Sequence, residues 1–381
     1  MYTFFVTRLA LALLVLLATA AGLGGQISHA RFRKAPAVAT EPARLAFRGV
    51  DASFIPQLEA AGVVFRDASG VARDPLAIFA SRGINLIRLR VWHTPSGDWC
   101  GTQQTLAMAR RAKAAGMSIM LCIHYSDSWA DPGQQTIPAA WQGQTLLQLR
   151  TSVQVYTRDL IASLDAQGTP PAIVQIGNET TDGMLWPTGR ISTAGFNAFA
   201  TLFTAGADGV RLAMPNPRTP IIMAHIDRGG DNAATRWFFD QMVSRNVAYD
   251  AIGLSYYPWW HGSLAAMQTN IYDVATRYGK RVMIVETAYP FTLGWNDNEN
   301  NFVGLSSQLQ PGFSATPGGQ AAFIAAVNNA VAALPNGRGM GTCYWAPEYV
   351  ANPALGSPWE NLAAFDFTGR ALPVLHTLGD Q

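Results

Sequence analysis

The sequence predicts an α/β protein with the (β/α)8 TIM barrel fold. Eight short apolar or β-branched runs alternate with segments of helical spacing, and nearly every run ends in polar or aromatic residues. This alternation extends over most of the 381 residues. The alternating part is long enough to form one large barrel domain. An open, doubly wound sheet is the alternative, because periodicity alone does not fix the number of strands.

Residues 1–30 differ in composition from the rest of the chain, and we interpret them as a secretory signal segment. Arg8 is their only charged residue, residues 9–21 are apolar, and small residues follow. The apolar stretch is shorter than the roughly 18 residues of a membrane-spanning helix, although a retained anchor stays open. We therefore expect a secreted or periplasmic protein, free of the membrane after signal removal, with residues 31–381 as a single catalytic domain.

The predicted strands and helices follow one another in regular order. Strands are expected at residues 46–51, 84–92, 118–124, 173–178, 221–225, 251–257, 282–286 and 341–345. Helical spacing is found at residues 105–115, 146–167, 193–212, 235–244, 264–278 and 320–334. Gly83, Gly116 and Gly279 come just before three of the strands, where glycine adopts the left-handed conformation that ends a helix.

Composition limits the classes of function. Lysine and arginine total 27 against 25 acidic residues, so the formal charge of +2 gives no field that would attract nucleic acid. The 11 tryptophans and 11 tyrosines supply flat amphipathic rings that suit a sugar-binding recess. Cys100, Cys122 and Cys343 are an odd number without zinc-site spacing, so we expect no disulfide framework. A monomer is the default expectation.

Polar and aromatic side chains gather at the carboxyl ends of the predicted strands. In a barrel these ends meet at one face, where groups from several strands line a single cleft. A polar residue at a single strand end is better explained by the strand meeting solvent there. Polar or aromatic residues at eight strand ends favour a shared functional site. The residues that we assign to this site are Asp51, Arg90, Trp92, His124, Asn178, Glu179, Tyr257, Glu286 and Trp345.

Two glutamates carry the functional hypothesis. Glu179 and Glu286 each end an apolar run, on the fourth and seventh predicted strands. Cleavage of a glycosidic bond needs two carboxyl groups, one to protonate the leaving oxygen and one to attack the anomeric carbon or activate water. Asn178, directly before the first glutamate, can hydrogen-bond the sugar 2-hydroxyl. The pattern therefore indicates a glycoside hydrolase.

Several strings of the sequence resemble glycoside hydrolase family 53, the arabinogalactan endo-β-1,4-galactanases. They are FRGVDAS (47–53), IRLRVW (87–92), HYSDSWADPG (124–133), QIGNE (175–179), SYYP (255–258) and VETAYP (285–290). They occur in order over about residues 45–378, and the ten-residue string is the most specific of them. The resemblance implies a retaining, endo-acting enzyme on β-1,4-galactan of pectin side chains, with Glu179 as acid/base and Glu286 as nucleophile.

The two roles require different protonation states. Glu179 needs a raised pKa, for which Trp186 and the charge of Glu286 are candidate causes. Glu286 must stay ionised, and we expect Arg90 and a tyrosine hydroxyl to hold it so. Alternation along the sixth strand selects Tyr257 for this contact. A structural ion pair within the barrel is the alternative role of Arg90.

Trp345, at the end of the eighth strand, is the candidate floor of the subsite where the bond breaks, as the resemblance also implies. Trp92, His124 and Asp51 complete the predicted substrate contacts. Four irregular segments are expected to wall the cleft: residues 127–143, 182–192, 289–319 and 347–362. Glu348, where family members often carry the acid two positions earlier, is expected at the edge of a subsite.

No metal or cofactor is required for hydrolysis by two carboxyl groups. His124 is followed by Asp127, but the other strand-end histidines lack ligand-like spacing, so we assign no metal site to them. The resemblance makes a structural calcium possible at Asp297, Glu299 and Asn301. We do not favour it, because Trp295 occupies the first alternate position where a carboxylate would be expected.

Two other functions stay open at this point. The same barrel and chemistry could act on another β-linked polysaccharide, such as mannan or xylan, since the loops that read sugar stereochemistry cannot be placed from the sequence. A non-catalytic carbohydrate-binding barrel is the alternative from a different class, and it would be expected to lack one of the two glutamates.

Overall fold

The computed structural model describes residues 44–97, 99–352 and 354–380. The predicted signal segment, residues 1–30, lies outside the described residues. The described residues belong to one compact unit, Pro42–Gln381. Within the described ranges, no helix combines the length and the apolar character that crossing a membrane requires.

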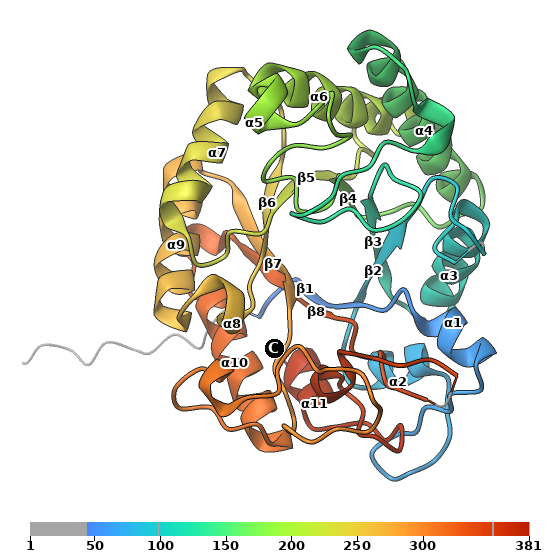
Figure 1. The fold of residues 1–381 in the computed structure, drawn as a ribbon, viewed down its shortest axis with the longest axis vertical. Coiled ribbons are helices and arrows are strands. Elements are labelled where there is room, and N and C mark those ends of the chain that lie inside the picture. The colour runs from blue at the N-terminus through green and yellow to red at the C-terminus, as the bar shows by residue number, and fades with distance from the viewer. Residues whose placement is uncertain (1–43, 98, 353, 381) are drawn as a thin grey trace, which may run out of the picture. The chain divides into compact units, whose positions relative to one another are not determined.

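Eight parallel strands close into a barrel in sequence order, with β8 hydrogen-bonded to β1 (Figure 1). The strands are β1 (Phe47–Asp51), β2 (Leu86–Val91), β3 (Ser118–Ile123), β4 (Ile173–Ile176), β5 (Ile221–Ile226), β6 (Ala251–Ser255), β7 (Arg281–Thr287) and β8 (Gly339–Trp345). The TIM barrel and all eight predicted strands are therefore confirmed, with ends that differ by one or two residues.

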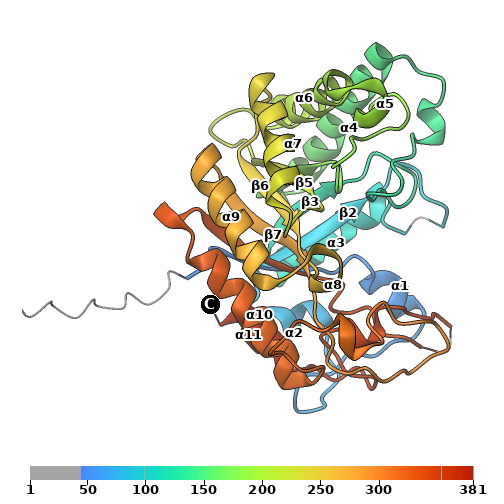
Figure 2. The same ribbon diagram turned by 60° about the vertical axis from the view of Figure 1, so that its left-hand side comes forward.

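Helices surround the ring of strands (Figure 1). The larger ones are α3 (Thr102–Ala114), α4 (Leu146–Ala166), α6 (Phe196–Ala213), α7 (Asn232–Ser244), α9 (Leu264–Tyr278) and α10 (Pro317–Ala332). They confirm the six predicted helical segments, except that the third is interrupted at Gly195, which separates the short helix α5 (Ile191–Ala194) from α6. Figure 2 shows α9 and α10 side by side on the outside of the barrel.

Short helices that the sequence did not predict complete the outer layer. They are α1 (Ile55–Ala60), α2 (Pro75–Ser81), α8 (Pro258–His261) and α11 (Val374–Gly379). Each has only four to seven residues, too few for a helical period to stand out in the sequence. Gly83, Gly116 and Gly279 have φ angles of +85°, +76° and +64°, which confirms their predicted conformation.

The barrel interior is apolar below the carboxyl ends of the strands. Its side chains come from seven strands: Leu86, Met120, Ile173, Met223, Ala251, Met283, Val285, Met340 and Cys343. Along β2, Arg88 and Arg90 follow Leu86 at intervals of two residues, so alternation places them on the same interior face. The polar part of the interior is therefore stacked on an apolar base, at the end where the strands finish.

A β-bulge on β7 changes which side chains face the interior. β6 and β7 pair regularly up to Leu254 and Ile284, and Ser255 then pairs with Glu286, so Val285 is the extra residue. Val285 packs in the interior cluster, and strict alternation after it would turn Glu286 outward. Because a bulge re-aims the next side chain, Glu286 instead lines the cavity at the top of the barrel.

Candidate active site

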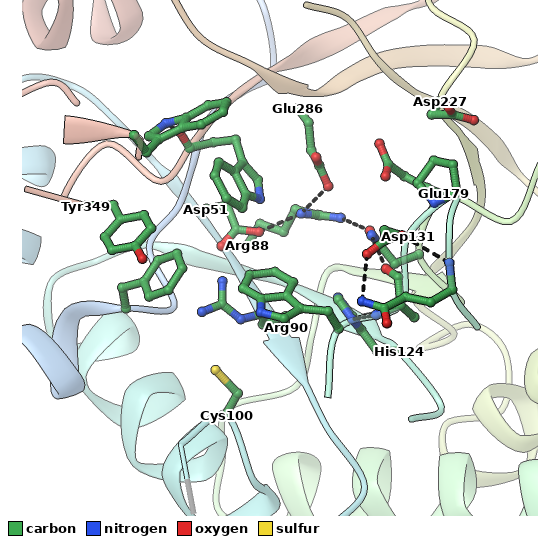
Figure 3. Close-up of a pocket in the computed structure, with 18 of the residues that line it drawn as sticks. Asp51, Arg88, Arg90, Cys100, His124, Asp131, Glu179, Asp227, Glu286 and Tyr349 are labelled. Atoms are coloured by element: carbon green, nitrogen blue, oxygen red, sulfur yellow. Dashed lines mark hydrogen bonds and ion pairs between the residues drawn. The ribbon is translucent and has the colours of Figure 1, made fainter. Parts of the chain in front are cut away.

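A cavity of about 820 Å³ opens at the carboxyl ends of the strands. It brings together all nine residues assigned from the sequence: Asp51, Arg90, Trp92, His124, Asn178, Glu179, Tyr257, Glu286 and Trp345. Residues of Figure 3 line this cavity, and the carboxyl groups of Glu179 and Glu286 lie near one another in it. One carboxylate oxygen of each glutamate and a ring nitrogen of His225 all lie within 4.8 Å of one another.

The Glu179 side chain is aimed by an unusual backbone. Strand β4 ends at Ile176, and Gly177 follows with φ of +78°, where an added Cβ would lie 2.4 Å from Thr180 Cγ2. Glu179 itself has φ of +45°, a conformation that costs energy for a residue with a Cβ. Gly177 is therefore required for the sharp turn that puts Glu179 at the mouth of the barrel.

The surroundings of Glu179 favour its protonated form. Burial, together with the negative charges of Glu286 and Asp227, raises the pKa of Glu179 well above its usual range. The Ser255 hydroxyl donates a hydrogen bond of 2.6 Å to Glu179 Oε1, which acts in the opposite direction by stabilising the carboxylate. On balance these surroundings favour the protonated form, as the role of a catalytic acid requires.

Glu286 is held by a cation and a hydroxyl. Arg88 Nη1 lies 2.9 Å from Glu286 Oε1, and the Tyr257 hydroxyl donates to Oε2 at 3.2 Å. Burial raises the pKa of Glu286 above its usual value on balance, while Arg88 and Tyr257 act in the opposite direction. The predicted contact between Tyr257 and Glu286 is therefore present in the structure.

The prediction that Arg90 holds Glu286 is wrong, and Arg88 has this position instead. Figure 3 shows the Arg88 guanidinium reaching both Asp51 and Glu286, while Arg90 lies apart. Both arginines face the interior, but Arg88 is one alternation deeper, at the depth of the Glu286 carboxylate. The Arg90 guanidinium carbon lies 4.0 Å from the centre of the Phe54 ring and 4.3 Å from that of Trp129, as a cation–π sandwich.

Asp51 and Asn178 are both engaged with Arg88. Asp51 accepts from Arg88 through Oδ2 and from the Ser53 hydroxyl through Oδ1. Asn178 Oδ1 accepts from Arg88 Nη2 at 2.7 Å, and its amide nitrogen donates to Ala130 O at 2.9 Å. An amide nitrogen carries two hydrogens, so one donor of Asn178 is left for a ligand.

The predicted effect of Trp186 on Glu179 is also not found. The Trp186 indole donates to Asp182 O and packs under Arg190, and it is not among the residues that line the cavity. Asp227, which follows β5, lies beside Glu179 instead (Figure 3). Asp227 was not predicted, because the fifth strand was expected to end at residue 225, one residue before its observed end at Ile226.

His124 and Trp92 form one side of the cavity. His124 Nδ1 accepts hydrogen bonds from the Ala130 amide at 3.1 Å and from the Trp92 indole at 3.3 Å. Burial and the charges of Arg88 and Arg90 lower the pKa of His124 well below its usual range. His124 is thus neutral with its hydrogen on Nε2, and it orders the loop after β3.

Aromatic rings line the cavity on both sides of the two glutamates. Trp345 contacts Trp359 edge-on, with ring centres 4.6 Å apart, and lies 6.2 Å from Trp129. On the β6 and β7 side, Trp260 lies 5.3 Å from Tyr257 and 5.5 Å from Phe302. Apolar ring faces with fixed polar groups between them are suited to sugar rings.

Comparison with known proteins identifies the family of this chain. The model of glycosyl hydrolase family 53 matches residues 47–378. This chain belongs to glycosyl hydrolase family 53. The match covers the whole barrel, from the first strand to the last helix, and it confirms the resemblance inferred from the sequence strings.

Relatives of this family 53 chain resemble it over most of their length. A Cellvibrio japonicus protein named arabinogalactan endo-beta-1,4-galactanase is 38% identical, with 85% of this chain and 88% of the relative covered. One of the same name from Thermothelomyces thermophilus is 34% identical, with coverage of 87% and 98%. The solved family 53 catalytic domain of Ignisphaera aggregans superposes with a TM-score of 0.82 at 34% identity, covering 87% of this chain and 95% of that one.

The loops that were expected to wall the cleft do so unequally. Residues 127–143, 289–319 and 347–362 each contribute side chains to the cavity, but residues 182–192 contribute none.

Glu348 is not at the edge of a subsite. It is fully buried, accepts the Phe54 backbone N–H at 2.9 Å, and burial raises its pKa to about 8.

The segment that was considered for calcium holds loop backbone together. Asp297 accepts backbone N–H groups from Glu299 and Ser357, both at 2.7 Å, and the Asn301 amide donates to Gly294 O at 3.3 Å. Both oxygens of Asp297 are thus already in use, and these contacts do not form a convergent ligand set. Calcium binding at this segment was considered possible from the sequence but was not favoured, and these contacts give no reason to favour it.

Arg88, Ser255, His225 and Gln175 are buried polar residues of the site whose roles the sequence analysis did not assign. All four lie on the inward faces of β2, β4, β5 and β6, at alternation positions just below the strand ends. A signal for them was present, since charged or polar residues inside an otherwise apolar strand are unusual.

Proposed function

We propose that this chain is a retaining endo-β-1,4-galactanase that cleaves the galactan of arabinogalactan. The observation that carries the proposal is the pair of carboxyl groups, Glu179 and Glu286, with oxygens less than 4.8 Å apart in an aromatic-lined cavity. Membership of glycosyl hydrolase family 53 supports the reaction class. The names of the relatives from Cellvibrio japonicus and Thermothelomyces thermophilus support the substrate.

Glu286 is the nucleophile and Glu179 the acid/base in this proposal. The Glu286 carboxylate attacks the anomeric carbon while the glycosidic bond breaks and Glu179 gives its proton to the leaving oxygen. Water, deprotonated by Glu179, then hydrolyses the glycosyl-enzyme. The contacts support this assignment, because Arg88 and Tyr257 stabilise a negative Glu286, whereas Asp227 and burial favour a neutral Glu179.

The spacing of the two glutamates supports retention of configuration. Retaining glycosidases have carboxyl groups about 5–5.5 Å apart, whereas inverting ones keep them about 6.5–9.5 Å apart to admit water. One oxygen of each carboxyl group lies within 4.8 Å of the other, which agrees with the shorter of these two spacings.

Secretion, a monomeric state and a neutral polysaccharide as the partner complete the proposal. Secretion is supported by the composition of residues 1–30 and the neutral partner by the formal charge of +2. Mannan and xylan remain the alternative substrates. A non-catalytic role is opposed by the presence of both glutamates.

The purified chain is to be incubated separately with β-1,4-galactan, mannan and xylan, and the products resolved by size. The proposal expects early release of mixed oligosaccharides from galactan alone. Shortening of mannan or xylan only would reject the substrate. Glu286→Ala should retain galactan binding without turnover, and Glu59→Gln, an exposed acid on α1, serves as the control with unchanged rate. Turnover by Glu286→Ala near the wild-type rate would reject the nucleophile.

A further inference from the structure

A continuous chain of hydrogen bonds joins the two catalytic glutamates underneath the cavity. From Glu286 it passes to Arg88, which donates to Gln175 Oε1 at 3.2 Å. Gln175 Nε2 lies 2.8 Å from His225 Nδ1, and His225 Nε2 lies 2.9 Å from the Ser255 hydroxyl. Ser255 Oγ completes the chain at Glu179 Oε1.

Arg88 fixes the direction of every bond in this chain. A guanidinium only donates, so the Gln175 carbonyl oxygen faces Arg88 and its amide nitrogen faces His225. His225 Nδ1 must then accept, which puts the ring hydrogen on Nε2. This hydrogen is donated to Ser255 Oγ, and the serine hydroxyl hydrogen is left to donate to Glu179 Oε1.

His225 also holds the backbone of the acid/base residue. Its Nδ1 accepts the Glu179 N–H at 3.3 Å, and its carbonyl oxygen accepts from Thr180 N at 2.9 Å and Thr180 Oγ1 at 3.1 Å. These contacts stabilise the turn that gives Glu179 its positive φ. The residue is therefore fixed both through its main chain and through its carboxyl group.

We propose that Ser255 and His225 are positioning residues that keep Oε1 of Glu179 occupied as an acceptor and so confine the catalytic proton to Oε2. This inference rests on the proposed function. Because Oε1 permanently accepts from Ser255, the proton given to the leaving oxygen and later regained from water is carried by Oε2 alone. His225 stays neutral throughout and takes up no proton, since a second ring hydrogen would face the amide nitrogen of Gln175.

The charged groups around Glu179 are Glu286, Asp227 and Arg88, and none of them changes in a serine variant. Ser255→Ala therefore removes one interaction, the hydrogen bond that favours the carboxylate. Without it the pKa of Glu179 rises, and the alkaline limb of the rate profile moves to higher pH. A purely structural defect would lower the rate at every pH and leave the limb in place.

The test compares kcat/KM on galactan with kcat/KM on a dinitrophenyl β-galactoside of the same chain length. A dinitrophenolate leaves without a proton, so its cleavage does not depend on where Glu179 carries one. For Ser255→Ala we expect a loss of about 100-fold on galactan, within the range of general acid catalysis, and a much smaller loss on the aryl substrate. Equal losses on both substrates, or an unmoved alkaline limb, would overturn the proposal.

Two further variants separate positioning from folding. Ser255→Thr keeps the hydroxyl and should restore most of the rate. Thr342→Val removes another buried barrel hydroxyl, one without a hydrogen-bond partner among the described residues. It should leave kcat/KM unchanged on both substrates. A Thr342→Val loss as large as that of Ser255→Ala would also count against the proposal.

The histidine state can be measured without any turnover. An unperturbed histidine titrates between about pH 5 and 8. Throughout this range, nitrogen-15 NMR of histidine-labelled protein should show that Nε2 of His225 carries a hydrogen and that Nδ1 does not. A His225 that titrates in this range, or that carries its hydrogen on Nδ1, would overturn the inference. A wild-type chain inactive on galactan would instead reject the proposed function and leave this measurement valid.

Discussion

The Arg88 guanidinium lies 2.9 Å from the Glu286 carboxylate and is almost completely buried with it. Arg88 also contacts Asp51, Gln175 and Asn178, so one side chain links β2 with β1, β4 and β7 at the level where the cavity begins. A buried cation of this kind offsets the negative charge of the carboxylates that contact it. The cation that favours an ionised Glu286 is therefore Arg88, two positions from the arginine that the sequence indicated.

Arg88→Lys should keep the charge but lose the geometry. A lysine ammonium cannot donate to Asp51, Glu286, Gln175 and Asn178 together, so we expect kcat to fall about 100-fold or more. Arg88 lowers the pKa of Glu286, and a weaker contact raises it. Because the proposed mechanism needs an ionised Glu286, the acidic limb of the kcat/KM profile should move to higher pH. Arg236→Lys alters an exposed ion pair with Asp273 and should change neither kcat nor the position of the acidic limb. An unmoved acidic limb in Arg88→Lys would contradict this prediction.

The fold was predictable because its signals are local and repeated. Eight apolar runs with polar ends, separated by helical spacing, suffice for a barrel even when each boundary is displaced by a residue or two. The placement of Glu179 and Glu286 in the cavity was predictable for the same reason, since each lies near the carboxyl end of an apolar strand. Helices of four to seven residues were missed, because they are shorter than two turns and have no period to detect.

The finer geometry of the site depends on features without a local signal. Nothing in the string MIVET shows that Val285 is the extra residue of a bulge, yet this bulge is what turns Glu286 inward. Arg88 and Arg90 both fit the interior face, and only the depth of the Glu286 carboxylate decides between them. The polarity of the Gln175, His225 and Ser255 hydrogen bonds likewise arises from residues on four different strands.

Asp227→Asn should move the alkaline limb of the pH profile to lower pH. The Asp227 charge raises the pKa of Glu179. In the proposed mechanism Glu179 must be protonated to act, so activity is lost as pH rises through this pKa. Removing the charge lowers the pKa, and the loss then begins at a lower pH. Asp231→Asn is a matched control on the same loop, because asparagine caps α7 about as well as aspartate. Equal shifts in both variants would show that the loop rather than the charge is responsible.

Glu348→Gln should stabilise the protein at alkaline pH. The buried carboxyl has a pKa of about 8 in the folded state, against a reference value of 4.5 for an exposed glutamate. Between these values the folded state binds more protons than the unfolded state, so the free energy of unfolding falls as pH rises, by about 1.4 kcal/mol per pH unit for this one group. Glutamine resembles the protonated form and keeps the acceptor for the Phe54 N–H.

Calorimetric Tm values at several pH settings would check this. The variant should exceed the wild type at pH 9 and approach it below pH 4.5. Glu59→Gln, which removes an exposed partner of Arg111 on α1, should change Tm only slightly and by the same amount from pH 5 to 9. A Glu348→Gln protein that loses stability in parallel with the wild type from pH 5 to 9 would contradict the assignment.

Phe302→Ala should weaken the binding of long substrates selectively. Phe302 is 47% exposed and lies two rings away from Tyr257, with Trp260 between them. Losing one stacking partner of about 1 kcal/mol corresponds to about a fivefold higher KM for polymeric galactan. The kcat should be unchanged, because no group that contacts Glu179 or Glu286 is altered, and short aryl galactosides should react at the wild-type rate. Trp237→Ala removes a similarly exposed ring on α7, outside the cavity, and should leave KM and kcat unchanged. If Phe302→Ala instead raised KM for short and long substrates alike, Phe302 would lie at the reacting sugar.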